Sequence, residues 1–235
     1  MYLCTNCGAP MEELYRRYCP TVLKLLECDE CGSLADKYIE YDPAIIFVDL
    51  ILIQKQAYRH LLYNSELKSY WKLLIVLCLA ESFRIYSLCI EGSKNSSAVE
   101  DILMKSNSNN ECNFYWTVCR TSFSMLAFLA TIVAITEIKW QLLKTQKPNG
   151  YSINNLMRAI VIGSSGKLLG FLGIIWKTIA TGPHYMLIEG HTYLCLITGY
   201  SVVCNSGKLS SSLILAIALV VHAFFLPTVS DEFDY

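Results

Sequence analysis

Apolar residues gather in long runs in the second half of this chain, whereas the first third mixes polar and apolar positions at short intervals. Five of the runs are 18 or 19 residues long and cover 73–90, 121–138, 159–176, 185–203 and 209–226. A helix needs about 17–25 apolar residues to cross a bilayer core of about 30 Å. The pattern therefore predicts a transmembrane helical domain over residues 65–235, with three to five spans.

Residues 1–64 predict a separate small domain with mixed elements. Polar and apolar side chains alternate along 35–42, which is typical of a short strand. Asp42 and Pro43 then have the residue types of a helix start, with Asp as the N-cap and Pro at the first helical position. We expect this helix to continue to about Tyr63.

The predicted helix carries one narrow polar stripe, formed by Asp49, Gln56 and His60, on an otherwise apolar surface. Two placements follow from this pattern. The helix packs on the rest of the small domain, or it lies in the membrane interface with Lys55 and Arg59 toward the head groups. The sequence favours neither placement over the other.

The composition supports a membrane protein. Hydrophobic residues make up 54% of the chain and charged residues only 17%, against roughly 25% in soluble domains. Residues 159–230 contain only four charged side chains, Lys167, Lys177, Glu189 and Lys208. The net charge of -1 gives no reason to expect a nucleic-acid partner, because phosphate binding needs an excess of Lys and Arg.

Four of the 11 cysteines form two copies of one motif, Cys4-Thr-Asn-Cys7-Gly and Cys28-Asp-Glu-Cys31-Gly. This spacing is typical of a zinc-ribbon-like site, in which four thiolates close the shell around a structural Zn²⁺. The alternatives are two disulfides or a redox pair. The first 30 residues lack the apolar run of a signal peptide, so we expect the motifs to face the reducing cytosol, which favours zinc. Cys19 is expected to be a small core residue.

These cysteine motifs, the stretch 35–42 and the sequence Ala-Tyr-Arg-His-Leu-Leu-Tyr-Asn at 57–64 resemble the Arv homology domain. That domain marks the Arv family of eukaryotic endoplasmic-reticulum membrane proteins. The resemblance implies non-enzymatic sterol transport and lipid homeostasis, with effects on sphingolipids and support of glycosylphosphatidylinositol (GPI) anchor synthesis. Its implied partners are membrane lipids, such as a sterol or a GPI precursor, and the proteins that make them.

Basic residues before the first span predict the orientation of the chain. Lys55, Arg59, Lys68 and Lys72 precede residue 73, which places residues 1–64 in the cytosol by the positive-inside rule. The loop 91–116 is then lumenal. It contains a sequon at Asn95, a possible glycosylation site close to the membrane.

The third apolar run contains two features that suggest chemistry. On a continuous helix its glycines would share one face, which either packs closely on another helix or forms a groove for a flat lipid such as a sterol. These glycines are Gly163, Gly166, Gly170 and Gly173. Lys167 lies mid-span and needs a partner, either Glu81 or Glu189 or a lipid phosphate. A polar path through the membrane would use Glu81, Arg84, Lys167, Glu189 and His191.

Three function hypotheses follow. The first is a non-enzymatic lipid carrier or homeostasis factor, and the second is a scaffold or regulatory subunit of a membrane enzyme complex for lipid or GPI synthesis. The third is a membrane enzyme that uses His184 as a base oriented by Glu189. That spacing is a single weak pattern at the edge of a span, so we expect no enzyme.

Overall fold

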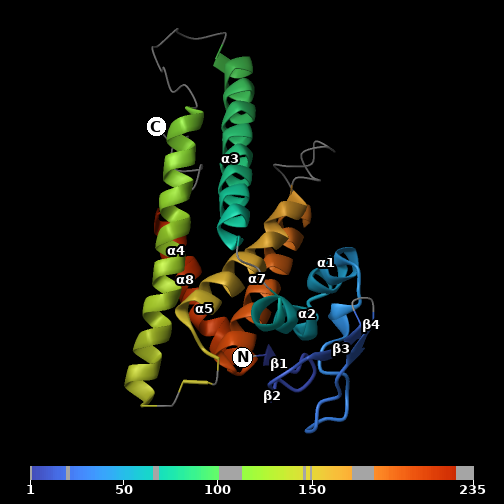
Figure 1. Cartoon of the computed structure of the whole chain (residues 1–235). Helices are drawn as coiled ribbons and strands as arrows, with labels where there is room; N and C mark the ends of the chain where they lie inside the picture. Colours follow the sequence, from blue (N-terminus) through green and yellow to red (C-terminus); the bar gives the residue numbers. More distant parts are fainter. Residues whose placement is uncertain are drawn as a thin grey trace.

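The computed structural model describes residues 2–19, 22–65, 69–100, 113–144, 147–148, 150–170 and 183–225, and these residues are mostly helical. Two long helices lie along the length of the molecule, and the small strands gather with two short helices at its lower right in Figure 1. This arrangement separates a small N-terminal domain from a larger helical one.

The N-terminal domain is built on two antiparallel strand pairs. The first joins β1 (Tyr2–Leu3) to β2 (Pro10–Met11), and the second joins β3 (Tyr15–Cys19) to β4 (Val22–Leu25). The register of the second pair shifts between Arg17 and Cys19. An isolated bridge between Glu27 and Leu34 closes a further loop, so each cysteine motif lies inside a narrow turn.

The strand predicted within 35–42 is wrong. The chain instead forms a 3₁₀ helix, η1 (Lys37–Ile39), whose N-cap is Asp36. The Asp36 carboxylate accepts a hydrogen bond from the backbone N–H of Tyr38 at 3.0 Å, and this local bond stabilises a turn in place of an extended chain. Alternation over a few residues could not reveal this bond.

The single helix predicted from Pro43 to Tyr63 is also wrong, because three elements occupy this stretch. They are α1 (Pro43–Ile51), α2 (Lys55–Arg59) and the π-helix η2 (His60–Asn64). The break lies at Ile53, whose φ of 58° is left-handed and therefore unfavourable for a β-branched residue. The break turns α2 and η2 into a different direction from α1.

Two helices have the length and hydropathy of membrane spans. They are α3 (Tyr70–Glu100) and α4 (Phe114–Leu143), within which Tyr70–Ile90 and Phe114–Leu142 have mean hydropathies of 2.0 and 1.8. At 1.5 Å per residue each helix is about 45 Å long, which exceeds the bilayer core of about 30 Å. The helix α3 extends to Glu100, so the predicted loop 91–116 begins later than expected.

In the part of the chain that the structure describes, the remaining helices do not form the three separate straight spans that the sequence predicts at 159–176, 185–203 and 209–226. They are α5 (Ile153–Ser164), the 3₁₀ helix η3 (Ser165–Leu169), α7 (Pro183–Cys204) and α8 (Lys208–Phe225). Within the third run, α5 is thus followed by η3 from Ser165. The helices α7 and α8 meet the criteria for a span only as a pair, and this pair is bent by 118°. Among the described residues there are thus two candidate spans, or three if the bent pair is one.

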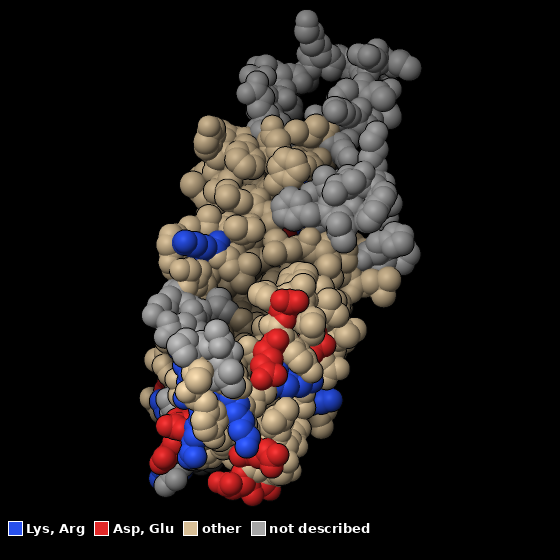
Figure 2. Space-filling model, turned by 45° about the vertical axis from the view of Figure 1, so that its right-hand side comes forward, with Lys and Arg blue, Asp and Glu red and all other residues tan. Residues whose placement is uncertain are grey.

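One hydrophobic core joins the two parts of the chain. Tyr58 and Leu62, from α2 and η2, are buried in the same cluster as Ile132 of α4, Leu156 of α5 and Tyr200 of α7. The charged side chains on the face shown in Figure 2 gather toward the end of the molecule that holds the N-terminal domain. The domain boundary predicted after residue 64 is therefore a boundary in composition, although the packing is continuous across it.

Candidate functional site

The two cysteine motifs form equivalent turns. In each turn the first cysteine donates its N–H to the residue five positions later, from Cys4 to Ala9 O at 2.8 Å and from Cys28 to Ser33 O at 2.8 Å. The glycine after each motif donates back to the first cysteine and has a left-handed φ, +87° at Gly8 and +65° at Gly32. Glycine adopts this conformation without steric cost, which explains its place in both motifs.

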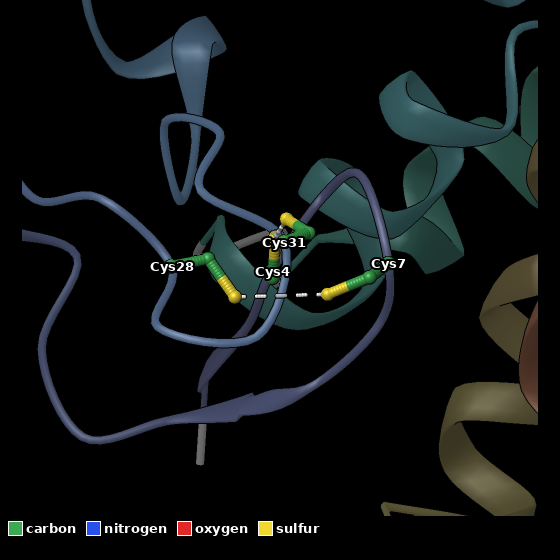
Figure 3. Close-up of side chains that lie close together, drawn as sticks. All are labelled: Cys4, Cys7, Cys28 and Cys31. Atoms are coloured by element: carbon green, nitrogen blue, oxygen red, sulfur yellow. Dashed lines mark hydrogen bonds between the residues drawn. The ribbon is translucent and has the colours of Figure 1, made fainter.

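The turns bring all four thiols together. Figure 3 shows the side chains of Cys4, Cys7, Cys28 and Cys31 pointing toward one another from two loops. Their sulfur atoms all lie within 4.8 Å of each other, and the pairs between the motifs are 3.8 Å apart for Cys4 and Cys31 and 3.6 Å for Cys7 and Cys28. Four sulfurs bound tetrahedrally to zinc at about 2.3 Å are about 3.8 Å apart, so the residues fit this ion.

Backbone groups around the cluster favour thiolates. Ala9 N–H donates to Cys7 Sγ at 3.5 Å. The backbone N–H of Ser33 lowers the pKa of the Cys31 thiol to about 6, whereas burial raises the pKa of the Cys7 thiol to about 12. Both contacts stabilise negative charge on sulfur, which is the form that binds a metal. The extra cysteine, Cys19, does not belong to this cluster, and it is exposed, so the expectation of a core residue is wrong.

The α2 helix packs directly on the first cysteine turn. Arg59 Nη1 donates to the carbonyl oxygens of Thr5, at 3.0 Å, and of Asn6, and Gln56 Nε2 donates to Asn6 Oδ1 at 3.1 Å. A Cβ atom at Gly8 would lie 3.4 Å from the Arg59 guanidinium. Arg59 therefore holds the turn that carries Cys4 and Cys7, a role that the sequence did not indicate, since Arg59 entered only the alternative in which the helix faces head groups.

A buried carboxylate connects the second cysteine turn to η2. Asp36 has no exposed surface and accepts from His60 Nδ1 and Asn64 Nδ2, both at 2.7 Å. Asn64 also pairs with the backbone of Leu3 in both directions, at 2.8 and 3.0 Å. His60 and Asn64 are one helical turn apart, so the sequence could predict that both side chains face the same partner. Nothing in the sequence indicated that this partner is Asp36.

The predicted polar stripe divides among α1, α2 and η2, and all three of its residues contact other parts of the N-terminal domain. Gln56 reaches Asn6 and His60 reaches Asp36, while Asp49 of α1 accepts from the Tyr38 hydroxyl at 2.7 Å. Burial raises the pKa of Tyr38, so its hydroxyl stays protonated as the donor. These contacts agree with the packing alternative for α2.

A second polar group lies among the membrane helices. Arg84 donates to both carboxylate oxygens of Glu81, at 2.6 and 3.2 Å, within α3. Lys167 Nζ, on η3, lies 3.7 Å from Glu81 and 3.9 Å from Glu189 of α7. Two positive and two negative side chains thus form one charge cluster that joins three elements.

A small cavity of about 40 Å³ opens beside this cluster. Lys167, Glu189 and His222 provide its charged and titratable walls, and Phe128 and Leu196 are among its apolar ones. This volume holds a few water molecules. His191, which we expected in the same polar path, instead places Nε2 2.8 Å from the carbonyl oxygen of Ile51 at the end of α1.

The glycines of the third run have different surroundings. A Cβ atom at Gly163 would lie 3.0 Å from Leu196 Cα, and one at Gly166 would lie 2.8 Å from Thr192 Oγ1, so both positions are filled by α7. A Cβ at Gly170 would meet no atom of the described residues within 4 Å. Gly173 lies outside the described residues, as do the side chains of Asn95 and His184, although their backbones belong to α3 and α7.

The fold and the site define the class: a membrane protein whose N-terminal four-cysteine module is packed onto its helices. The chain belongs to the Arv1-like family, which it matches over residues 3–199, so the predicted resemblance is confirmed. It is 31% identical over 224 residues to Protein ARV1 of Mus musculus, covering 95% of this chain and 81% of that protein. It is 30% identical over 226 residues to Protein ARV1 of Homo sapiens, covering 96% and 80%. It is 36% identical over 103 residues to Protein ARV 2 of Arabidopsis thaliana, covering 41% and 44%. No solved structure matches the chain.

Proposed function

We propose that this protein is a non-enzymatic mediator of lipid homeostasis, including sterol transport, in the endoplasmic-reticulum membrane. Its family membership supports this reading. The proposal that the protein is not an enzyme rests on the charge cluster, in which Glu81, Arg84, Lys167 and Glu189 are paired with one another. Charges inside a membrane are costly unless they are paired, and these side chains satisfy one another without requiring a substrate. The same resemblance extends the proposal to sphingolipid balance and GPI-anchor synthesis.

The proposed cofactor is one structural zinc ion on Cys4, Cys7, Cys28 and Cys31. Four sulfur ligands would close its coordination shell, so the ion would supply folding energy and no open position for a substrate. Arg59 and Asp36 would then hold the two cysteine turns in register with α2 and η2.

The proposed orientation places the cysteine module in the cytosol. The basic residues at 55–72 lie on the module side of the first span. Cys89, near the other end of that span, is disulfide-bonded, as a cysteine on the oxidising lumenal side can be. The cysteine motifs thus precede the apolar segment Tyr70–Ile90, and the disulfide lies near its far end.

A scaffold or regulatory subunit is the second candidate function. The observation that favours it is the size of the cavity beside Lys167, about 40 Å³, which admits water and excludes a lipid. Gly163 and Gly166, which could have lined a lipid groove, are covered by α7. In this version the cysteine module would bind a protein of lipid or GPI synthesis.

Mass spectrometry of the lipids that co-purify with the full chain in mild detergent tests both versions. Enrichment of a sterol or a GPI precursor over bulk phospholipid is expected for a carrier, and a profile equal to that of the source membrane would contradict direct transport. Lys167→Ala should remove the enrichment at unchanged abundance if Lys167 contacts lipid, while lower abundance alone indicates a structural role. Lys208→Ala, an exposed lysine at the start of α8, is the matched control.

A further inference from the structure

The helix α1 turns apolar side chains outward. None of its residues is buried, and the side chains that form its outer face are between two-fifths and three-fifths exposed. They are Ile45 at 44%, Phe47 at 56%, Val48 at 52% and, at the C-cap, Leu52 at 61%. An apolar face of this kind on a short helix needs a partner that removes it from water.

The inner face of α1 is already occupied by the protein. Its one charged residue, Asp49, is turned inward, where its carboxylate accepts from the Tyr38 hydroxyl at 2.7 Å. Leu50 packs against the main core cluster, and the Ile51 carbonyl lies 2.8 Å from His191 Nε2. These contacts fix the rotation of the helix, with the charge toward the protein and the apolar residues away from it.

The C-terminal end of α1 lies beside an apolar surface of α7. His191, which contacts the end of α1, lies on α7 between Leu187 and Leu194, four residues after one and three before the other. On a helix these three residues share one face, and the two leucines are 68% and 51% exposed. The end of α1 thus lies beside a helix that presents apolar side chains outward and belongs to a candidate span.

The start of α3 indicates where the membrane surface lies. Trp71, in the first turn of α3, is 53% exposed and is followed by Lys72, the pairing of aromatic and basic residues found where spans enter the head-group region. In Figure 1 α1 lies near the height of this end of α3, at the outer edge of the molecule.

We propose that the outer face of α1 lies in the interfacial layer of the bilayer and anchors the cysteine module against the membrane surface. Interfacial helices bury their apolar face about 5–10 Å into the boundary between head groups and acyl chains. In α1 the polar side contacts the cysteine module in place of water. The proposal goes beyond the proposed function, because it holds whichever lipid the protein handles and whether or not it carries one.

Photo-crosslinking tests this contact in the full chain. The photoreactive residue p-benzoylphenylalanine replaces Phe47, and the protein is reconstituted into phosphatidylcholine vesicles with tritiated acyl chains. Neither Phe47 nor the control position Tyr18, which is 66% exposed on β3, lies in the core, so the substitutions leave the fold intact. After irradiation, the tritium bound to the purified chain is counted and protein adducts are separated on a denaturing gel.

Tritium on the Phe47 variant, with a signal at background on the Tyr18 variant, is the expected result. Equal labelling of both variants would show contact without preference for α1 and would overturn the proposal. An adduct of Phe47 with a second copy of the chain would also overturn it, because that would make α1 a protein interface. Absence of any adduct at Phe47 would place the helix in water and overturn it as well.

Discussion

At the scale of single residues, Asp36 is the side chain on which most of the N-terminal domain depends. Its carboxylate accepts from Tyr38 N, His60 Nδ1 and Asn64 Nδ2 and is fully buried. The first of these bonds forms η1, and the other two attach η2 to the module. A buried carboxylate with three donors is stable only while all of its partners remain in place.

Replacing Asp36 therefore predicts a large loss of stability. Asp36→Ala removes the acceptor of the Tyr38 N–H and of His60 Nδ1 and one of the two acceptors of Asn64 Nδ2, and each buried donor left unsatisfied costs about 1–3 kcal/mol. The measurement is the rate of tryptic cleavage at Arg16 and Arg17, two exposed sites on β3. Cleavage faster than in the wild type is expected for Asp36→Ala. The wild-type rate is expected for Asp29→Ala, which removes an exposed carboxylate in the second turn. Wild-type rates in Asp36→Ala would show that the network adds nothing.

At the scale of elements, the length of the apolar segments predicted the long helices, whereas residue patterns failed to predict the short elements. Segments of about 18 mostly apolar residues leave few alternatives in a membrane, so α3 and α4 followed from composition. The break at Ile53 and the change from α5 to η3 at Ser165 depend on tertiary contacts instead. The glycine face assumed a continuous helix, and the structure divides its members between packed and open positions.

This division predicts different responses from two neighbouring glycines. Gly166→Ala places a methyl group 2.8 Å from Thr192 Oγ1 and should destabilise the packing of η3 on α7 by about 1–3 kcal/mol. Gly170→Ala adds a methyl group in open space and should leave stability unchanged. The melting temperature of the purified chain in detergent, followed by size-exclusion chromatography after heating, compares the two. If Gly170→Ala alone were destabilised, the packed arrangement of η3 would be contradicted.

At the scale of the whole molecule, the module and the membrane helices share one core. The cysteine spacing alone predicted the four-sulfur cluster, because two motifs of this kind have one common geometry. The attachment of the cluster to the membrane domain could not be predicted, since it depends on Arg59 meeting two backbone carbonyls and on Tyr58 entering the core of distant helices. Such contacts between residues far apart in the chain leave no periodic signal.

The metal content of the purified full chain tests the central claim most directly. Elemental analysis should find one zinc ion per chain in the wild type and in Cys19→Ser, and none in the double variant Cys28→Ser, Cys31→Ser. Because a bound ion would supply much of the folding energy of so small a module, trypsin should also digest residues 1–42 of the double variant while cleaving the other two chains slowly. A zinc-free wild type, or a double variant whose module stays folded without metal, would contradict the account.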